Sequence, residues 1–168
     1  ETPTTSQTNN EFAVAYSFLR EDVKIQRPTL SFDTNTDSHG FNAGYTRYLG
    51  GSATEAGIFG LTADLGVNID NNKASLVTVA GGVTVKARNN KYIQPYARVL
   101  GGVARQNVSR FNLLNTTDVT AVAILGAGVD FNTSAYSRYK IGFGADYVNT
   151  GFNGVRQNGA RLTARFVF

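Results

Sequence analysis

Residues 57–68 read GIFGLTADLGVN, and this stretch decides the fold. From residue 59 onward, the odd-numbered positions carry apolar side chains, whereas the even-numbered positions carry glycine or polar residues. A period of two is the pattern of a β-strand whose two faces meet different surroundings. The stretch therefore predicts a strand with one bulky apolar face and one face of small and polar residues.

The same alternation recurs in seven other segments of the 168-residue chain. The eight predicted strands are Asn10–Leu19, Gly40–Tyr48, Gly57–Asn68, Ser75–Ala87, Tyr92–Ala104, Val119–Phe131, Tyr139–Tyr147 and Ala160–Phe168. Strands that follow one another without intervening helical patterns favour an antiparallel all-β fold. We expect one domain over residues 10–168, preceded by a polar N-terminal extension over residues 1–9.

The size of the side chains on each face indicates which face points outward. Apolar and polar residues alternate in any antiparallel sheet that has one buried face. A soluble sandwich or a lipocalin-like barrel is therefore the alternative to a membrane barrel. An eight-stranded barrel has an interior only wide enough for side chains to fill, and the bulky face would overpack it. The apolar face must then point outward, where it needs lipid. The sequence predicts an eight-stranded antiparallel up-and-down transmembrane β-barrel.

The composition excludes several other classes of protein. No segment approaches the run of about 20 apolar residues that a transmembrane helix requires. The chain has no Cys, so it has neither disulfides nor thiol chemistry. The net charge of +4 comes from scattered residues, with no basic run or nucleic-acid-binding motif. We expect no nucleic acid partner.

Charged residues recur on the predicted inward face. With nearly balanced signs in a narrow lumen, they are expected to pair, because an isolated buried charge carries a high desolvation cost. The predicted charge network consists of Glu11, Asp64, Lys86, Arg98, Asp130, Lys140, Asp146, Arg161 and Arg165. Such a network predicts a closed polar interior. A narrow pore for ions or small solutes is the alternative.

Aromatic residues fall near the two ends of the predicted strands, as in the interfacial belts of membrane proteins. The predicted lipid-interface aromatics are Phe12, Phe59, Phe131, Tyr139 and Phe168 at one rim, and Phe18, Phe41 and Tyr147 at the other. If both termini lie on the periplasmic side, the long connections lie outside. These predicted outer loops are Arg20–His39, Ile69–Ala74, Arg105–Asp118 and Val148–Asn158.

Catalysis and metal binding are weakly indicated. The one histidine, His39, falls in the first predicted loop beside Asp33, Asp37 and Ser38, a set that resembles an acyl-transfer group. Neighbours in one loop are not preorganised, so a solvated polar turn is the preferred interpretation. The segment 70–72, Asp-Asn-Asn, lacks the glycine and the terminal Glu of a calcium loop. We expect no enzyme activity, no metal and no cofactor.

Both ends of the barrel resemble a known family. The segment 16–20, Tyr-Ser-Phe-Leu-Arg, resembles the GGYSYLR opening of small outer-membrane barrel proteins of the OmpA/OmpX type. The ending resembles one subgroup of that family, with Asp146-Tyr147, Arg156-Gln157-Asn158, Arg161-Leu162 and Phe166-Val167-Phe168. Alternate apolar residues before the last Phe are similar to the signal that the barrel-assembly machinery reads, here Leu162, Ala164, Phe166 and Phe168.

The resemblance implies a multi-pass protein of the bacterial outer membrane that is exported through the periplasm. Its expected partners are outer-membrane lipid, lipopolysaccharide and, during biogenesis, the barrel-assembly machinery. Arg20 and Arg156 at the outer rim are candidates to contact lipopolysaccharide phosphates. We expect a monomer with a structural or surface-interaction role, similar to adhesion, in which the extracellular loops contact a protein or another surface ligand.

Overall fold

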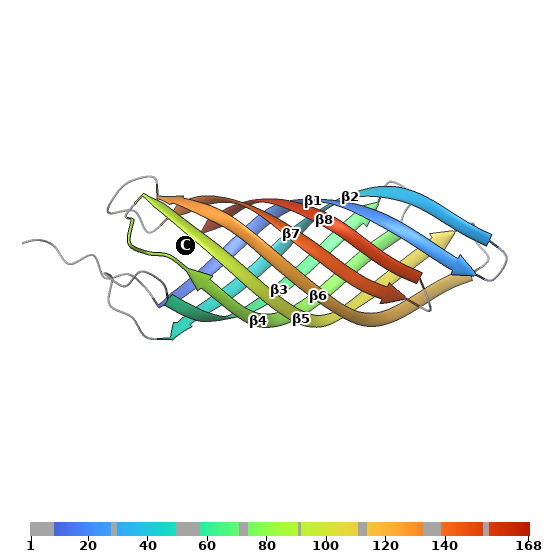
Figure 1. Cartoon of the computed structure of the whole chain (residues 1–168), viewed down its shortest axis with the longest axis horizontal. Coiled ribbons are helices and arrows are strands. Elements are labelled where there is room, and N and C mark those ends of the chain that lie inside the picture. The colour runs from blue at the N-terminus through green and yellow to red at the C-terminus, as the bar shows by residue number, and fades with distance from the viewer. Residues whose placement is uncertain are drawn as a thin grey trace, which may run out of the picture.

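Eight strands follow one another along the chain in the computed structural model (Figure 1). The structure describes residues 9–27, 30–49, 58–70, 74–90, 92–110, 114–132, 139–152 and 155–168. The strands are β1 (Asn10–Arg27), β2 (Leu30–Leu49), β3 (Ile58–Asp70), β4 (Ala74–Lys86), β5 (Ile93–Arg110), β6 (Leu114–Asn132), β7 (Lys140–Phe152) and β8 (Val155–Val167). Within these ranges, no helix is long and apolar enough to cross a membrane.

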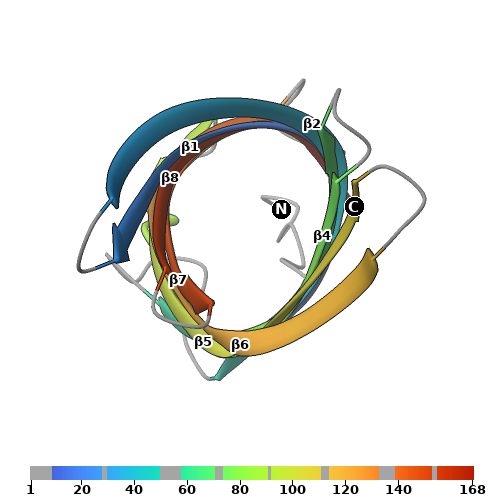
Figure 2. The same cartoon turned by 90° about the vertical axis from the view of Figure 1, so that its right-hand side faces the viewer.

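The strands close into a barrel. Each strand pairs antiparallel with the next one, and β8 returns to pair with β1 from Ala13↔Val167 to Ile25↔Val155. Backbone hydrogen bonds of 2.8 and 2.9 Å between Phe12 and Phe168 extend this seam by one more pair. The end-on view shows the resulting closed ring (Figure 2). The closed antiparallel up-and-down barrel predicted from the sequence is confirmed.

The two ends of the barrel differ, and we name them by what they hold. The terminal end carries the first residues of β1 and the last residues of β8, at the left of Figure 1. The hairpin end carries the last residues of β1, β3, β5 and β7 and the first residues of β2, β4, β6 and β8. The predicted N-terminal extension, residues 1–9, lies outside the described residues except for Asn9.

Most of each of three predicted outer loops is strand: the apolar residues of 23–32 already allow an extension of the first hairpin, whereas the loops predicted over 105–118 and 148–158 are wrong. β1 and β2 stay paired as far as Arg27↔Leu30, and β5 and β6 as far as Arg110↔Leu114. β7 and β8 likewise stay paired up to Phe152↔Val155. Alternation of side chains reports a difference between two faces of a sheet, whereas backbone pairing needs no such difference. The strands therefore continue past the point where the sequence pattern ends.

Most of the bulky apolar side chains point outward, as predicted. Along β3, buried and exposed residues alternate strictly up to Asp70. The outward side chains include Phe41, which is 66% exposed, and Val99, which is 61% exposed. The buried side chains of the same strands are largely small, polar or charged. The chain thus buries its ionic residues and exposes its apolar ones, the reverse of a soluble barrel.

Two Gly-Gly pairs lie in adjacent strands, at points where the neighbouring backbone approaches closely. A Cβ at the inward-facing Gly102 would collide with the backbone carbonyl oxygen of Val79, and one at Gly82 would collide with that of Val99. At Gly101, which faces outward, no atom lies within 4 Å of the Cβ position. In the Gly101-Gly102 pair, therefore, only the inward residue, Gly102, must be glycine for packing reasons.

Alanine substitutions at these neighbouring positions should have opposite effects. We expect Gly102→Ala to lower the free energy of unfolding by about 1–3 kcal/mol, because the backbone must shift to admit the methyl group. Gly101→Ala should be neutral or slightly stabilising, because alanine restricts the unfolded chain. Urea titration of the protein refolded in detergent micelles measures both. Equal effects at the two positions would contradict the packing described here.

Candidate functional site

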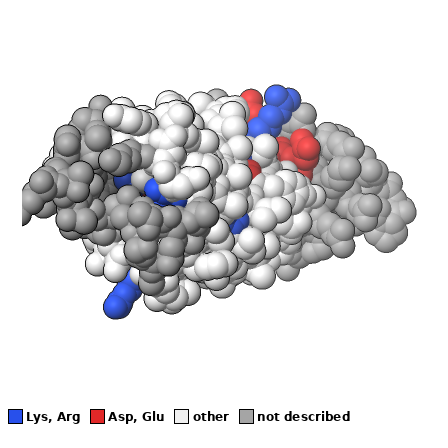
Figure 3. All heavy atoms as spheres, turned by 60° about the vertical axis from the view of Figure 1, so that its left-hand side comes forward, with Lys and Arg blue, Asp and Glu red and all other residues white. Residues whose placement is uncertain are grey.

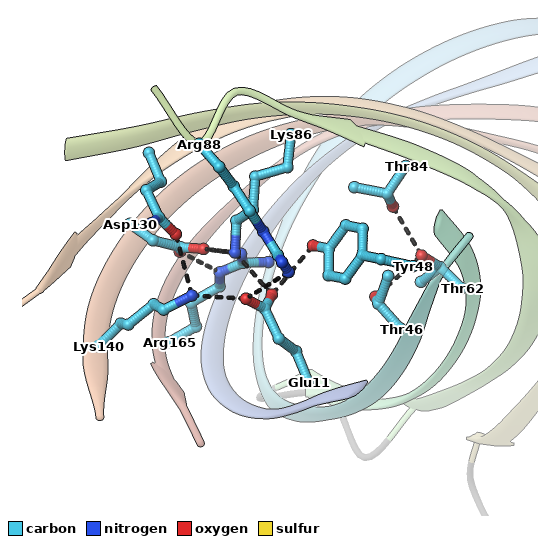
Figure 4. Close-up of polar contacts among 11 residues, drawn as sticks. Glu11, Thr46, Tyr48, Thr62, Thr84, Lys86, Arg88, Asp130, Lys140 and Arg165 are labelled. Atoms are coloured by element: carbon cyan, nitrogen blue, oxygen red, sulfur yellow. Dashed lines mark hydrogen bonds and ion pairs between the residues drawn. The ribbon is translucent and has the colours of Figure 1, made fainter. Parts of the chain in front are cut away.

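The main candidate site is a set of ion pairs at the terminal end of the lumen. We call Glu11, Lys86, Arg88, Asp130, Lys140 and Arg165 the terminal cluster (Figure 4). The Lys86 Nζ atom lies 2.6 Å from Glu11 Oε2 and 2.7 Å from Asp130 Oδ2. The Lys140 Nζ atom donates to Glu11 Oε1 at 2.5 Å. One carboxylate, that of Glu11, thus accepts from cations on β4 and β7.

Two tyrosines complete the terminal cluster. The hydroxyl of Tyr48 donates to Glu11 Oε2 at 3.0 Å, and its ring lies 4.2 Å from the guanidinium carbon of Arg88. The guanidinium carbon of Arg165 lies 3.9 Å from the centre of the Tyr96 ring. At such distances the ring quadrupole attracts the cation. The tyrosine rings therefore hold the two arginines in place without adding charge.

A second set of ion pairs lies further along the lumen. We call Asp64, Arg98, Asp146 and Arg161 the central cluster. Arg98 binds both carboxylate oxygens of Asp146, with Nε–Oδ1 at 3.0 Å and Nη2–Oδ2 at 2.7 Å. Arg161 Nε donates to Asp146 Oδ2 at 2.8 Å, and Arg98 Nη1 donates to Asp64 Oδ2 at 3.2 Å. Such two-point contacts are among the strongest hydrogen bonds in proteins.

Toward the hairpin end, a group of apolar side chains is buried in the lumen among polar ones such as Ser17, Asn68 and Thr150. We call this buried group the apolar plug; its members are Leu19, Leu76, Ala80, Leu100, Ala104, Val122, Ile124 and Val148. The predicted polar interior is therefore interrupted by apolar side chains in this part of the barrel. The signal was present in the sequence, because pairs of adjacent apolar residues such as Val99-Leu100 and Ile124-Leu125 place one side chain on each face.

The structure places all nine residues of the predicted charge network inside the barrel and divides them between the two clusters.

Sequence analysis missed Arg88 because that residue lies just past the end of β4. Arg88 is two residues after Lys86, and side chains at this spacing along a strand lie on the same face, so the sequence could have indicated that Arg88 points inward. Tyr48 and Gln94 were also missed, because uncharged polar residues are common on either face of a strand; the Gln94 side chain accepts from Lys140 at 2.9 Å.

The eight predicted interface aromatics all lie on the outer surface, with Phe18 half-buried and the others exposed. At the terminal end, the rings of Phe12 and Phe168 stack at 6.0 Å. Toward the hairpin end, the rings of Phe18 and His39 lie 5.2 Å apart. The residues of the predicted assembly signal, Leu162, Ala164, Phe166 and Phe168, also point outward.

The residues around His39 do not form an acyl-transfer group. Ser38 is buried and donates to the carbonyl oxygen of Leu19 at 3.4 Å, whereas His39 points outward and its Nδ1 lies 2.6 Å from the Tyr16 hydroxyl. Neighbours in a strand face opposite sides, so this serine and this histidine cannot meet. The side chain of Asp33 lies outside the described residues, as do residues 71–72 of the calcium-like segment.

Charged side chains on the outside of the barrel lie close to its ends. Figure 3 shows one face, on which white spheres cover most of the described middle and acidic side chains gather toward the hairpin end. Arg20 and Asp37 form an outward pair at 4.0 Å near the hairpin end, where Arg105 is also exposed. Arg47 is exposed near the terminal end. Between these levels, the outward positions of the described strands carry no Lys, Arg, Asp or Glu.

Comparison with known proteins identifies the fold. No family model and no curated protein matches the chain. Among solved structures, the chain is similar to Neisserial surface protein A, with 13% identity and a TM-score of 0.64 over 93% of this chain and 95% of that one. It is also similar to Ail, the attachment invasion locus protein of Yersinia pestis, in a crystal structure with the heparin analogue sucrose octasulfate. The identity to Ail is 17% and the TM-score is 0.54, over 96% of this chain and 100% of that one.

A third similar structure is the N-terminal β-barrel domain of Pseudomonas aeruginosa OprF, with 17% identity and a TM-score of 0.50 over 93% of this chain and 97% of that one. At these identities the likeness shows the fold alone. The chain has the closed eight-stranded barrel fold of small outer-membrane proteins. The resemblance to the OmpA/OmpX type that the sequence indicated is confirmed at the level of the fold.

Proposed function

We propose that this chain is a non-enzymatic integral protein of the bacterial outer membrane, with a closed lumen and a surface-interaction role at its hairpin end. The observation that carries the membrane location is the apolar outer surface. Exposed Phe and Leu side chains cover the barrel between charged residues at its two ends. An apolar band of this kind, flanked by aromatic residues, matches the hydrocarbon layer of an outer membrane.

Detergent dependence and gel mobility test the membrane location. We expect purified protein to stay monodisperse only in detergent or lipid, because its apolar band would otherwise associate. Unheated samples should migrate differently from boiled ones and should resist protease within the barrel. A sample that is monodisperse in plain buffer would contradict the proposal.

The lumen is proposed to be closed, and the contents of the barrel support this. The apolar plug lies toward the hairpin end together with buried polar side chains such as Asn68 and Thr78, while the two clusters of ion pairs lie toward the terminal end. An eight-stranded barrel leaves room only for side chains. The narrow pore predicted as the alternative would have to pass Leu100 and Ile124, which are 2% and 1% exposed.

Planar-bilayer recordings separate the closed barrel from the pore. We expect wild-type protein to give no stable openings, because ions would have to cross the apolar plug without hydration. Leu100→Ala and Ile124→Ala, which shorten side chains of the plug, should produce brief openings that wild-type protein lacks. Stable wild-type openings that change with Arg98→Gln would favour the pore instead.

The surface role is supported by the shape of the hairpin end. β2 pairs with β3 only as far as Ser38↔Asp70, so residues 30–37 of β2 extend beyond β3. β6 pairs with β7 only from Val122↔Thr150, so residues 114–121 of β6 extend beyond that pairing. Both segments still pair on their other side, with β1 and β5. An extended hairpin with an edge that is not in the ladder of a described strand suits contact with another protein.

The similar structures agree with a role at the cell surface. One is named as a surface protein, and another was crystallised with a heparin analogue. We infer that an extracellular protein or another surface ligand binds the paired β1–β2 extension, residues 20–37, which we call the first arm. Lipopolysaccharide contact at Arg20 and recognition of Phe168 by the barrel-assembly machinery are also proposed. The side chain of Arg156 lies outside the described residues.

Shortening the first arm tests the surface role. In the variant, residues 23–34 are replaced by Asn-Gly, a two-residue turn that suits a hairpin between Asp22 and Asn35, which pair in the structure. We expect bacteria that display the variant to adhere several-fold less to cultured epithelial cells than bacteria that display the full chain. Unchanged heat-modifiable gel mobility is the control for folding. Equal adherence would contradict a role for this arm.

A further inference from the structure

Inward residues of β2, β3 and β4 form one polar row in the middle of the barrel. Asn42 pairs with Gly66, and Gly66 pairs with Thr78, so the glycine lies between two polar side chains. Asn42 is 5% exposed and Thr78 is 2% exposed. All three residues lie well inside described strands, and the adjoining parts of β1 and β5 are described as well. The row is therefore a buried polar site whose neighbouring strands are all known.

Both polar side chains of the row lack hydrogen bonds that buried groups normally make. Within the described part of the chain, neither the Oδ1 atom of Asn42 nor the Oγ1 atom of Thr78 has a hydrogen-bond partner. The amide nitrogen of Asn42 donates one of its two protons to Asp64 Oδ1 at 3.3 Å. The large majority of buried polar groups in proteins are bonded to protein or to ordered water. These atoms therefore indicate a partner that is not part of the chain.

Gly66 lets the two side chains approach closely enough for one molecule to bridge them. The Nδ2 atom of Asn42 and the Oγ1 atom of Thr78 each lie 2.6 Å from the point that a Cβ at Gly66 would occupy. The two atoms are therefore separated by no more than twice that distance. Two hydrogen bonds of about 2.8 Å, placed end to end, span slightly more than this. A Cβ would collide with both atoms, so this approach requires glycine.

The surroundings of the row favour a small neutral ligand. The row continues with Ala15 on β1 and Ala104 on β5, which provide no further side-chain oxygen atoms. A calcium or magnesium ion would need about six oxygen ligands, more than this row offers. Water both donates and accepts, and an internal water molecule typically makes two to four hydrogen bonds to buried polar groups. Water therefore fits the amide and the hydroxyl.

We propose that Asn42, Gly66 and Thr78 form a binding site for an internal water molecule, which bonds to the Asn42 amide and to the Thr78 hydroxyl. Because Asn42 also bonds to Asp64, the water extends the polar network of the central cluster as far as β4. A water molecule held in this way satisfies buried groups and opens no path through the lumen. The site does not depend on the surface role proposed above.

Water-to-methyl cross-relaxation in NMR spectra tests the site directly, on the full methyl-labelled chain folded in detergent micelles. We expect wild-type protein to show a contact between water and the Thr78 methyl group, with the sign of a long-lived internal water. Thr84 is the matched control in the same strand, because it is buried but its hydroxyl lies 2.6 Å from that of Thr62. Absence of the contact at Thr78, or an equal contact at Thr84, would overturn the proposal.

Thr78→Val measures what the bound water contributes to stability. Valine keeps the shape of threonine and removes only the hydroxyl. We expect the equilibrium constant for unfolding in urea to rise about three- to tenfold, because a buried hydrogen bond is lost. If the hydroxyl has no partner, its removal should instead lower that constant, and this result would also overturn the proposal. If Thr78→Val does not fold, the wild-type contacts at Thr78 and Thr84 still decide the question.

Discussion

Val99→Arg is expected to lower the free energy of unfolding from lipid vesicles by about 2–4 kcal/mol. Val99 lies on the outer face of β5, midway between Ile93 near the terminal end and Arg105 near the hairpin end. If the apolar band faces hydrocarbon, an arginine there loses its hydration. In a water-soluble barrel, the same exposed position would tolerate arginine within about 0.5 kcal/mol.

Val119→Arg provides a control, because the Val119 side chain is as exposed as that of Val99 but lies nearer the edge of the apolar band. Val119 is 60% exposed, against 61% for Val99, yet it pairs with Arg105 at the level of the outward charges. We expect this second substitution to cost only about 0–1 kcal/mol, the range found near the membrane interface. Reversible urea unfolding in vesicles measures both variants. Equal costs at the two positions would refute the membrane orientation of the outer surface.

The number, order and facing of the strands could be predicted from the sequence, because each of these properties follows from side-chain alternation. In residues 59–67, bulky residues alternate with Gly, Thr and Asp, and the residues of β3 are exposed and buried with the same period of two. The direction of the apolar face followed from a volume argument, since Phe59, Leu61 and Leu65 could not all fit inside eight strands. These are local or additive properties of the chain.

The lengths of the strands and the contents of the lumen could not be predicted in the same way. Apolar residues such as Val23 and Ile25 allow an extension of the first hairpin, but nothing in the sequence around Ser109 and Asn115, which also pair, distinguishes that segment from a polar loop. The division of the charges into two clusters depends on the stagger of strands around the barrel, which brings Glu11 of β1 to Lys86 of β4 and Lys140 of β7. Alternation alone carries no information on that stagger.

Asp146→Asn is expected to lower the free energy of unfolding by about 3–5 kcal/mol, the cost of breaking a buried ion pair by removing one partner. Asp146 is 4% exposed and holds both arginines of the central cluster. In the variant, Arg98 and Arg161 would share the single carboxylate of Asp64. The remaining excess of positive charge would lie in the middle of the barrel, out of reach of solvent.

The double variant Asp146→Asn/Arg161→Gln shows whether charge balance is what stabilises the central cluster. It leaves Arg98 and Asp64, whose Nη1 and Oδ2 atoms already lie 3.2 Å apart, as a balanced pair. We therefore expect the double variant to be more stable than Asp146→Asn alone, although it lacks one more hydrogen-bonded side chain. Urea unfolding in micelles gives the coupling energy. Additive losses would instead mean that each side chain stabilises the barrel independently, and that the cluster is packed polar filling without a requirement for balanced charge.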